Sequence, residues 1–165
     1  MCVPDVREAA ELRKDRPLLS PKATSSAATV VMRGNRRRDT RPEMAIRSEV
    51  HRRGLRYRVD NQPILDLRRR ADLVFRSAKV AVFVDGCLWH GCPEHCRVPE
   101  THREYWSEKI DRNMRRDLDT DRRLRKEGWV SIRIWEHDDP EEAAAKVADV
   151  VSVRSRSSSS PLRRA

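Results

Sequence analysis

The chain has no hydrophobic run that approaches the length of a membrane span. Its N-terminus carries Asp5, Glu8 and Glu11 where a secretory signal would need an apolar core. No internal repeat is visible. Cysteine is scarce outside one region, because Cys2 stands alone and the other three of the four cysteines fall within residues 87–96. These absences predict a cytoplasmic protein without a membrane partner.

The length and composition predict one folded domain between two tails. The 165 residues can bury one modest core. Residues 1–31 and 153–165 lack apolar periodicity and are rich in Ser, Pro and Arg, so we expect disordered tails around a core of residues 32–152. The formal net charge is +10 and Arg heavily outnumbers Lys. Arg suits bidentate contact with phosphate, which favours nucleic acid as the partner, although a GC-rich genome also enriches Arg.

Capping residues and apolar spacing predict an alternation of helices and strands. Thr40 to Glu43 fits a capping box with Pro near the helix start, and Gly54 ends that helix. The expected helices cover residues 41–53, 102–127 (one long helix or a broken pair) and 139–152. The expected strands cover residues 55–59, 73–75, 79–84 and 129–135. This order predicts an α/β domain with a mixed sheet between helices.

Two carboxylates flank a predicted hairpin of adjacent strands. Asp72 stands just before one strand-like run and Asp85 just after the next, so the hairpin brings them together. Such oxygens suit Mg²⁺, which polarises a phosphodiester and activates water. His90 is the candidate general base, and Glu43 is placed to assist through bound water. The plainer alternatives are an ion pair of Asp72 with arginines 68–70, a turn at Asp85, a surface histidine and a glutamate that only completes the capping box.

Thiols and imidazoles alternate directly after this strand end. Cys87, Cys92 and His95 offer three of the ligands that zinc prefers. A closed tetrahedral site needs a fourth, and His137, after the last strand, is the best distant candidate. Such a site would tie the last strand to the loop. Cys96 can replace either histidine, and the alternative to a metal is a set of free thiols beside solvated histidines.

The hard and soft ligand clusters together resemble the very-short-patch repair (Vsr) family of DNA mismatch endonucleases. The matching segments follow the family's order over about residues 32–138. They are Arg38–Glu43, Gly54–Val59, Ala71–Phe75, Val82–His95, Tyr105–Ile110 and Gly128–His137. The resemblance implies a restriction-endonuclease-like fold and a Mg²⁺-dependent enzyme that nicks the T strand beside T·G mismatches, which arise when 5-methylcytosine deaminates.

The resemblance also implies roles for single residues. Asp72 and the backbone carbonyl of Val84 match the Mg²⁺ ligands, His90 matches the catalytic histidine, and Glu43 matches a helix glutamate near the site. The positions of the structural zinc fall on Cys87, Cys92, His95 and His137. Leu88, Trp89 and Trp106 match side chains that wedge into the base stack, where a mispaired step costs least to open. The plainer reading of Trp106 is a core residue on an amphipathic helix. We also expect DNA contacts from the basic arm, at Arg36, Arg37 and Arg38.

The chain departs from the family pattern in ways that leave roles open. Val84 and Asp85 replace a Thr-His pair, so Asp85 is either a metal ligand or a proton carrier. Leu88 replaces an aromatic wedge, Ala71 replaces a proline, and Cys96 is extra. The expected partner is double-stranded DNA with a T·G mismatch, bound by a monomer near the nucleoid. The alternatives are a restriction-like or defence endonuclease that needs no mismatch, and an inactive zinc-stapled DNA-binding module.

Overall fold

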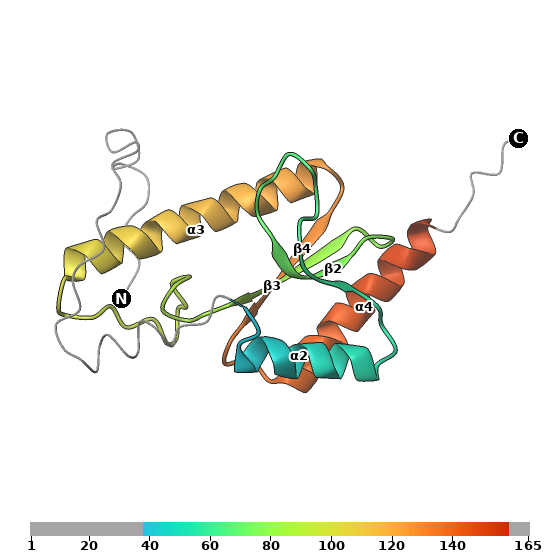
Figure 1. Ribbon diagram of the computed structural model, residues 1–165, viewed down its shortest axis with the longest axis horizontal. Coiled ribbons are helices and arrows are strands. Elements are labelled where there is room, and N and C mark those ends of the chain that lie inside the picture. The colour runs from blue at the N-terminus through green and yellow to red at the C-terminus, as the bar shows by residue number, and fades with distance from the viewer. Residues whose placement is uncertain (1–37, 159–165) are drawn as a thin grey trace, which may run out of the picture.

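The computed structural model describes residues 38–158, which form a mixed α/β unit (Figure 1). This part of the chain contains three helices and four strands. The helices are α2 (Arg41–Arg52), α3 (Arg103–Lys126) and α4 (Pro140–Ser158), and the strands are β1 (Arg58–Asn61), β2 (Ala71–Phe75), β3 (Val80–Asp85) and β4 (Val130–Trp135). The predicted mixed sheet between helices is confirmed. Of the helices in this range, none has the length and apolar character needed to cross a membrane.

The four strands form one sheet in the order β1-β2-β3-β4. The β1/β2 and β2/β3 pairs are antiparallel, and β3/β4 is parallel. Leu73 pairs with Val82, which confirms the predicted hairpin, and Val82 pairs with Ile132 on the other side. A parallel neighbour needs a long crossover, which α3 supplies. The end of β3 therefore lies between the start of β2 and the end of β4.

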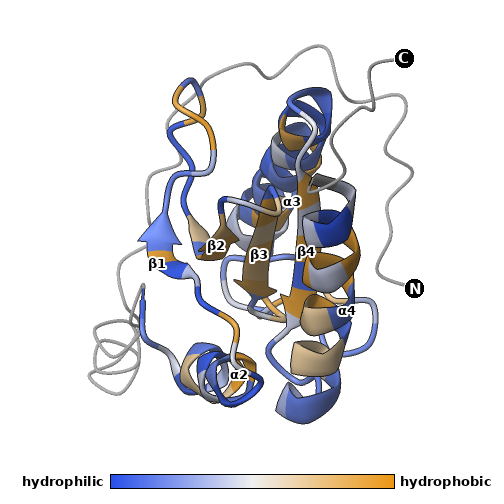
Figure 2. Cartoon of the chain, turned by 90° about the vertical axis from the view of Figure 1, so that its right-hand side faces the viewer, coloured by the Kyte–Doolittle hydropathy of each residue, from blue (hydrophilic) through white to orange (hydrophobic). Residues whose placement is uncertain are grey.

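Helices pack on both faces of the sheet (Figure 2), and a cluster of buried apolar residues lies on each face. On one face, α2 and α4 pack on the strands through a cluster that includes Ile46, Val50, Leu73, Val82, Ile134 and Val147. On the other face, α3 and the segment before β2 contribute to a second cluster that includes Leu67, Val74, Phe83, Leu124 and Trp129. Because α3 covers only part of this second face, the strand ends beside it remain open to a cavity.

The start of α2 is capped as the sequence predicts. The Glu43 N–H donates to Thr40 Oγ1 at 3.5 Å, and the Thr40 hydroxyl donates to Glu43 Oε1 at 3.0 Å. The second carboxylate oxygen of Glu43 accepts the N–H of Asp39 at 2.9 Å. These bonds satisfy N–H groups that a helix start leaves without partners.

Three predicted elements differ from the structure by two residues or more at one end or both. Strand β2 begins at Ala71, two residues before the expected start, so Asp72 lies within it. The strand expected at residues 55–59 is observed at Arg58–Asn61. Leu55 donates to the Val50 carbonyl in the turn that closes α2, so the alternation of apolar and basic residues starts before the strand does. Helix α4 continues to Ser158, past residue 152, where we expected the core to end. Its last turns are anchored by Arg154, which donates to the Ala78 carbonyl at 3.2 Å.

Candidate active site

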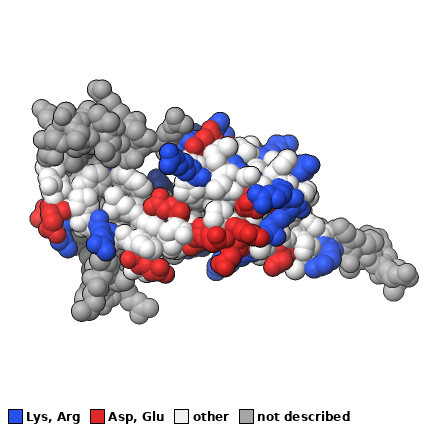
Figure 3. All heavy atoms as spheres, turned by 90° about the horizontal axis from the view of Figure 1, so that it is seen from below, with Lys and Arg blue, Asp and Glu red and all other residues white. Residues whose placement is uncertain are grey.

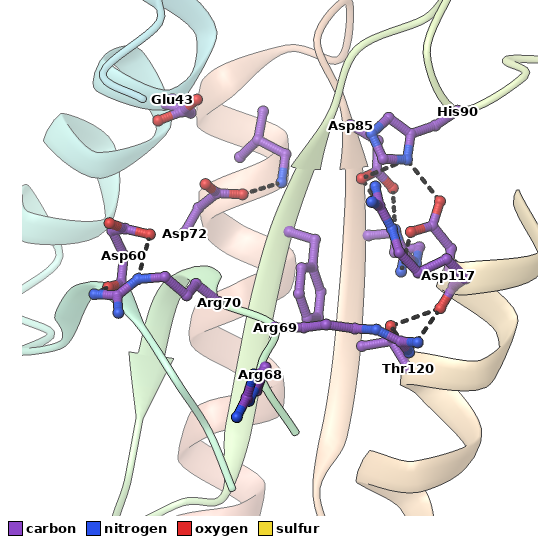
Figure 4. A pocket seen from close by; sticks show the side chains of 14 residues that line it. Glu43, Asp60, Arg68, Arg69, Arg70, Asp72, Asp85, His90, Asp117 and Thr120 are labelled. Carbon is purple, nitrogen blue, oxygen red and sulfur yellow. Dashed lines mark hydrogen bonds and ion pairs between the residues drawn. The ribbon is translucent and has the colours of Figure 1, made fainter. Parts of the chain in front are cut away.

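The start of β2, the end of β3, the start of α2 and the middle of α3 line a cavity of about 440 Å³ (Figure 4). All four residues that we predicted to be catalytic line this one cavity: Glu43, Asp72, Asp85 and His90. Asp72 and Asp85 are on the face of the sheet that α3 covers. The structure therefore brings together groups from three separate parts of the sequence.

Asp72 is a half-buried carboxylate with a fixed orientation. Its Oδ2 accepts the N–H of Val84 at 2.7 Å, which ties it to the end of β3. The pKa of Asp72 is raised to about 6, mainly by burial and also by the negative charges of Glu43 and Asp85, while the Val84 N–H and Arg47 oppose the shift. The charged form is thus unfavourable, so a bound cation would be stabilised here.

The suggested ion pair between Asp72 and the arginines before it is absent within residues 38–158. Arg69 pairs with Asp119 at 2.8 Å and donates to Thr120 Oγ1 at 2.7 Å, which joins this segment to α3. Arg70 pairs with Asp60 at 2.8 Å. These contacts hold the segment before β2 in place at the edge of the cavity and leave Asp72 facing into it.

Glu43 fulfils its capping role and also lines the cavity. Its Oε2 accepts from Arg47 Nη2 at 2.9 Å, one turn further along α2. Both side chains are buried, at 7% and 8% exposed. The carboxylate is therefore neutralised by Arg47 on one side and lies near Asp72 on the other, which suits a supporting role through water.

His90 is held by a carboxylate that the sequence analysis missed. Its Nδ1 lies 2.6 Å from Asp117 Oδ2 and 3.5 Å from Asp85 Oδ1. Burial alone would raise the pKa of Asp117, but the hydrogen bond with His90 and the charge of Arg133 together lower it. The signal for Asp117 was available: it follows Ile110 by seven residues and Met114 by three, so it falls on the inner side of α3.

Asp85 is paired with a second residue that the sequence did not reveal. Both oxygens of Asp85 accept from Arg133 Nη1, at 3.0 and 2.7 Å. Burial raises the pKa of Asp85, while the charges of His90 and Arg133 oppose this shift. Arg133 lies on β4, and its side chain points to the same face of the sheet as Asp85.

Next to the cavity, the predicted thiols and imidazoles form a compact group. The ligand atoms of Cys87, Cys92, His95 and His137 all lie within 4.8 Å of one another. Cys87 Sγ is 3.1 Å from His137 Nδ1, so the end of β4 meets the loop after β3. Cys96 lies outside this group, and its thiol donates to the Leu88 carbonyl at 3.9 Å.

The chemistry of this group fits a bound metal ion. Burial raises the pKa of the Cys87 thiol, and the neighbouring Cys92 and Glu136 raise it further. A thiolate at this position therefore needs a cation to be stable. Two sulfur and two imidazole donors are a set that suits zinc in a closed tetrahedral site.

Gly91 lets the loop that carries His90 approach α3 closely. Its φ of +68° lies in the left-handed region that favours glycine. A Cβ atom at Gly91 would also lie 2.6 Å from Met114 Sδ on α3. Glycine therefore allows both the turn between His90 and Cys92 and the close packing of this loop on α3.

Two of the three predicted wedge residues, Trp89 in the loop after β3 and Trp106 near the start of α3, lie against each other. The rings of Trp89 and Trp106 are 5.6 Å apart at 62°, and Lys109 Nζ lies 5.2 Å from the Trp89 centroid and 5.7 Å from that of Trp106. Trp106 is half-buried and belongs to neither core cluster, so the reading of Trp106 as a core residue is not supported. Leu88 is also half-buried.

The basic arm is only partly within the described residues. Arg38 is exposed and pairs with Asp39 at 3.1 Å and Asp60 at 3.6 Å, whereas Arg36 and Arg37 lie outside the described range. On the face seen from below in Figure 1, acidic side chains gather near the centre with basic ones around them (Figure 3). This face is therefore not uniformly positive.

Comparison with known proteins agrees with this site. The family profile described as DNA mismatch endonuclease Vsr matches residues 21–97. The type II nicking enzyme V.NaeI of Lentzea aerocolonigenes is 40% identical over 147 residues, which cover 88% of this chain and 89% of that protein. The type II nicking enzyme V.NmeDIP of Neisseria meningitidis serogroup C is 41% identical, over 65% of this chain and 72% of its own. The DNA mismatch endonuclease Vsr of Escherichia coli (strain K12) is 36% identical, over 64% and 66%.

The α/β fold, the carboxylates at the strand ends and these similarities define a DNA endonuclease. The chain belongs to the Vsr family, as its sequence motifs predicted.

Proposed function

We propose that this endonuclease nicks the T-containing strand of duplex DNA beside a T·G mismatch, with Mg²⁺ as its catalytic ion. The observation that carries the proposal is that Asp72, His90 and Asp117 line the same cavity. Asp72 and the backbone carbonyl of Val84 are the expected ligands of the ion. When bound there, the ion would polarise the phosphodiester and favour the attack of water.

His90 is the proposed general base for the attacking water. Since Asp117 holds Nδ1 at 2.6 Å, a neutral imidazole that donates from Nδ1 keeps Nε2 free to accept a proton. Glu43 supports the site through water, and Arg47 balances its charge. The inactive DNA-binding alternative does not account for this arrangement, because binding alone has no use for a histidine oriented by a carboxylate.

The T·G preference is supported by a pair of aromatic side chains. Trp89, in the loop after β3, lies against Trp106 near the start of α3, with ring centroids 5.6 Å apart. We propose that these rings, with Leu88, enter the base stack. Opening a stack costs a few kcal/mol per step and least at a mispaired step, so wedges favour mismatched DNA. Arg38, and the arm that includes Arg36 and Arg37, would add contacts to phosphate.

We further propose that the Cys/His group binds zinc and that the fold is restriction-endonuclease-like. The four ligands Cys87, Cys92, His95 and His137 join the loop after β3 to the end of β4. For the domain boundaries, residues 32–152 remain our proposal for the endonuclease core, extended at the C-terminal side by the last turns of α4. A monomer bound to one duplex is the proposed functional unit.

A second candidate function is favoured by the names of the relatives. V.NaeI and V.NmeDIP are described as type II nicking enzymes, without mention of a mismatch. An endonuclease that cuts without needing a mismatch is therefore the alternative. The two functions differ in their substrates and share the same chemical step.

One nicking assay separates these functions. Duplexes with T·G, with other mismatches and with matched pairs, each labelled on one strand, are incubated with protein and Mg²⁺. The proposal predicts a nick in the T strand of the T·G duplex, abolished in Asp72→Ala and retained in Asp149→Ala, which removes an exposed carboxylate from α4. Equal nicking rates on matched and T·G duplexes would favour the second candidate. Full activity of Asp72→Ala would show that Asp72 is not a ligand of the catalytic ion.

A further inference from the structure

Arg133 contacts three carboxylates that come from β3 and α3. Its Nη1 donates to both oxygens of Asp85, at 3.0 and 2.7 Å. Its Nη2 lies 3.2 Å from Asp117 Oδ1, and its Nε donates to Asp121 Oδ2 at 3.1 Å. The ring of Phe83 lies against the guanidinium, with its centroid 4.9 Å from Cζ. All three nitrogen atoms of the guanidinium are therefore engaged where β3, β4 and α3 meet.

These contacts occupy Asp85. Its side chain is 5% exposed, and both oxygens face the same Nη1. A metal ion would have to displace the guanidinium to take Asp85 as a ligand. Asp72, in contrast, forms no ion pair among residues 38–158, and its Oδ2 accepts only a backbone N–H. Of the two carboxylates at the strand ends, Asp72 is thus the one available to a cation.

The same guanidinium also fixes the carboxylates that hold His90. Asp117 uses one oxygen for Arg133 and the other for His90 Nδ1, at 3.2 and 2.6 Å. Asp85 Oδ1 lies 3.5 Å from the same Nδ1. The orientation of the imidazole therefore depends on Asp117 and Asp85 (Figure 4). The positions of both carboxylates are in turn set by Arg133.

We propose that Arg133 is a positioning residue of the nuclease site, which holds Asp85 away from the divalent ion and, through Asp117, fixes the ring of His90. The inference rests on the proposed function, since it takes Asp72 as a metal ligand and His90 as the proton acceptor. It assigns Asp85 as the counter-ion of Arg133, in place of the metal ligand or proton carrier that the sequence left open.

Four variants test the two parts of this proposal. Arg133→Lys keeps the positive charge and loses the planar fork. Arg133→Gln frees Asp85, Asp85→Asn removes its charge, and the double variant Arg133→Gln/Asp85→Asn restores the local charge balance. Because removing one partner of a buried pair is strongly destabilising, the double variant and Asp85→Asn keep the test open if Arg133→Gln does not fold. Arg156→Lys, exposed on α4, is the matched control.

Three measurements are made on each folded variant. Mn²⁺ binding is measured from the electron paramagnetic resonance of the free ion, DNA affinity from fluorescence anisotropy in Ca²⁺, and nicking of a T·G duplex under single-turnover conditions. Arg133→Lys should lower the nicking rate by about 10- to 100-fold, the range typical of partners that orient a site's ligands, with unchanged DNA affinity. Arg133→Gln should gain Mn²⁺ affinity that the double variant loses, and Asp85→Asn alone should bind Mn²⁺ like the wild type.

Two results would overturn the proposal. One is a wild-type nicking rate in Arg133→Lys. The other is a loss of Mn²⁺ affinity in Asp85→Asn as large as that in Asp72→Asn, which is measured alongside as the reference for losing a metal ligand. If the wild-type protein nicks no duplex, the proposed function fails, but the Mn²⁺ measurements still decide whether Arg133 keeps Asp85 from the ion.

Discussion

Replacing Asp72 by Asn should stabilise the protein in the absence of a divalent ion. Burial raises the pKa of Asp72 from 3.8 to about 6, and the charges of Glu43 and Asp85 contribute to the shift. At about 1.4 kcal/mol per pKa unit, the ionised carboxylate then costs about 3 kcal/mol in the folded state. In the Asp72→Asn variant the side-chain oxygen can still accept the Val84 N–H, which lies 2.7 Å from Oδ2 in the wild type, but the charge is lost.

The sign of the effect follows from the direction of this pKa shift. Because the folded pKa is higher than the unfolded one, the folded protein binds the Asp72 proton more tightly between 3.8 and about 6. The free energy of unfolding of the wild type therefore falls as the pH rises through this window, relative to the variant. The full cost persists at neutral and alkaline pH, where the carboxylate is ionised in both states.

The assay is urea or thermal unfolding of both proteins with no added divalent ion. The difference in unfolding free energy should be small at about pH 4 and reach about 3 kcal/mol at about pH 8, which corresponds to roughly 10 °C in Tm. Added Mg²⁺ should narrow the gap at the higher pH, since an ion that binds only the wild type stabilises it alone. Asp149→Asn is the control. A variant no more stable than the wild type at about pH 8 would refute the reasoning.

Three further outcomes are expected. Arg68 and Arg116 line the cavity and form no ion pair within residues 38–158. Arg68→Gln and Arg116→Gln should each reduce the slope of log K for DNA against log salt by about 0.9, measured by DNA titration in a salt series. Trp106→Ala should lose about 1–3 kcal/mol of stacking, measured as a smaller ratio of T·G to matched nicking; an unchanged ratio contradicts the wedge. Cys92→Ser should contain less bound metal in elemental analysis and should have a lower Tm than the wild type. If the variant lost the metal but kept the wild-type Tm, the ion would not be structural.

Local patterns in the sequence were sufficient to locate the strands and much of the site. The run before Asp85 is apolar and β-branched, which is typical of a buried strand, and a hairpin with the run after Asp72 was the simplest way to pair it. The spacing of Cys87, Cys92 and His95 likewise identified a compact group of soft ligands. In each case the residues lie close in the sequence, so their proximity in space needs only one turn.

Asp117 and Arg133 were missed because their partners are distant in the sequence. Helix α3 is dense in charge, and although the spacing from Ile110 and Met114 places Asp117 on its inner side, the spacing does not show that a histidine lies opposite. On β4, the apolar alternation predicted the face of Ile132 and Ile134, which leaves Arg133 on the other face. The neighbours of Arg133 on that face depend on how α3 packs across the sheet. This packing rests on contacts between residues distant in the sequence, such as those of Leu124, which local periodicity does not predict.

The Cys/His group and the nuclease site share one short segment, and this links stability to catalysis. His90 stands between Cys87 and Cys92, and its backbone N–H donates to the Gly86 carbonyl at 3.1 Å. The Cys92 N–H donates to the Cys87 carbonyl at 3.0 Å, so the loop closes around the histidine. Since His137 joins this loop to the end of β4, an ion held by the four ligands would fix the backbone on both sides of His90. The imidazole would thus be held at its ring by Asp117 and at its backbone by the neighbouring ligands, which is how a histidine on a loop without regular secondary structure can be held rigidly.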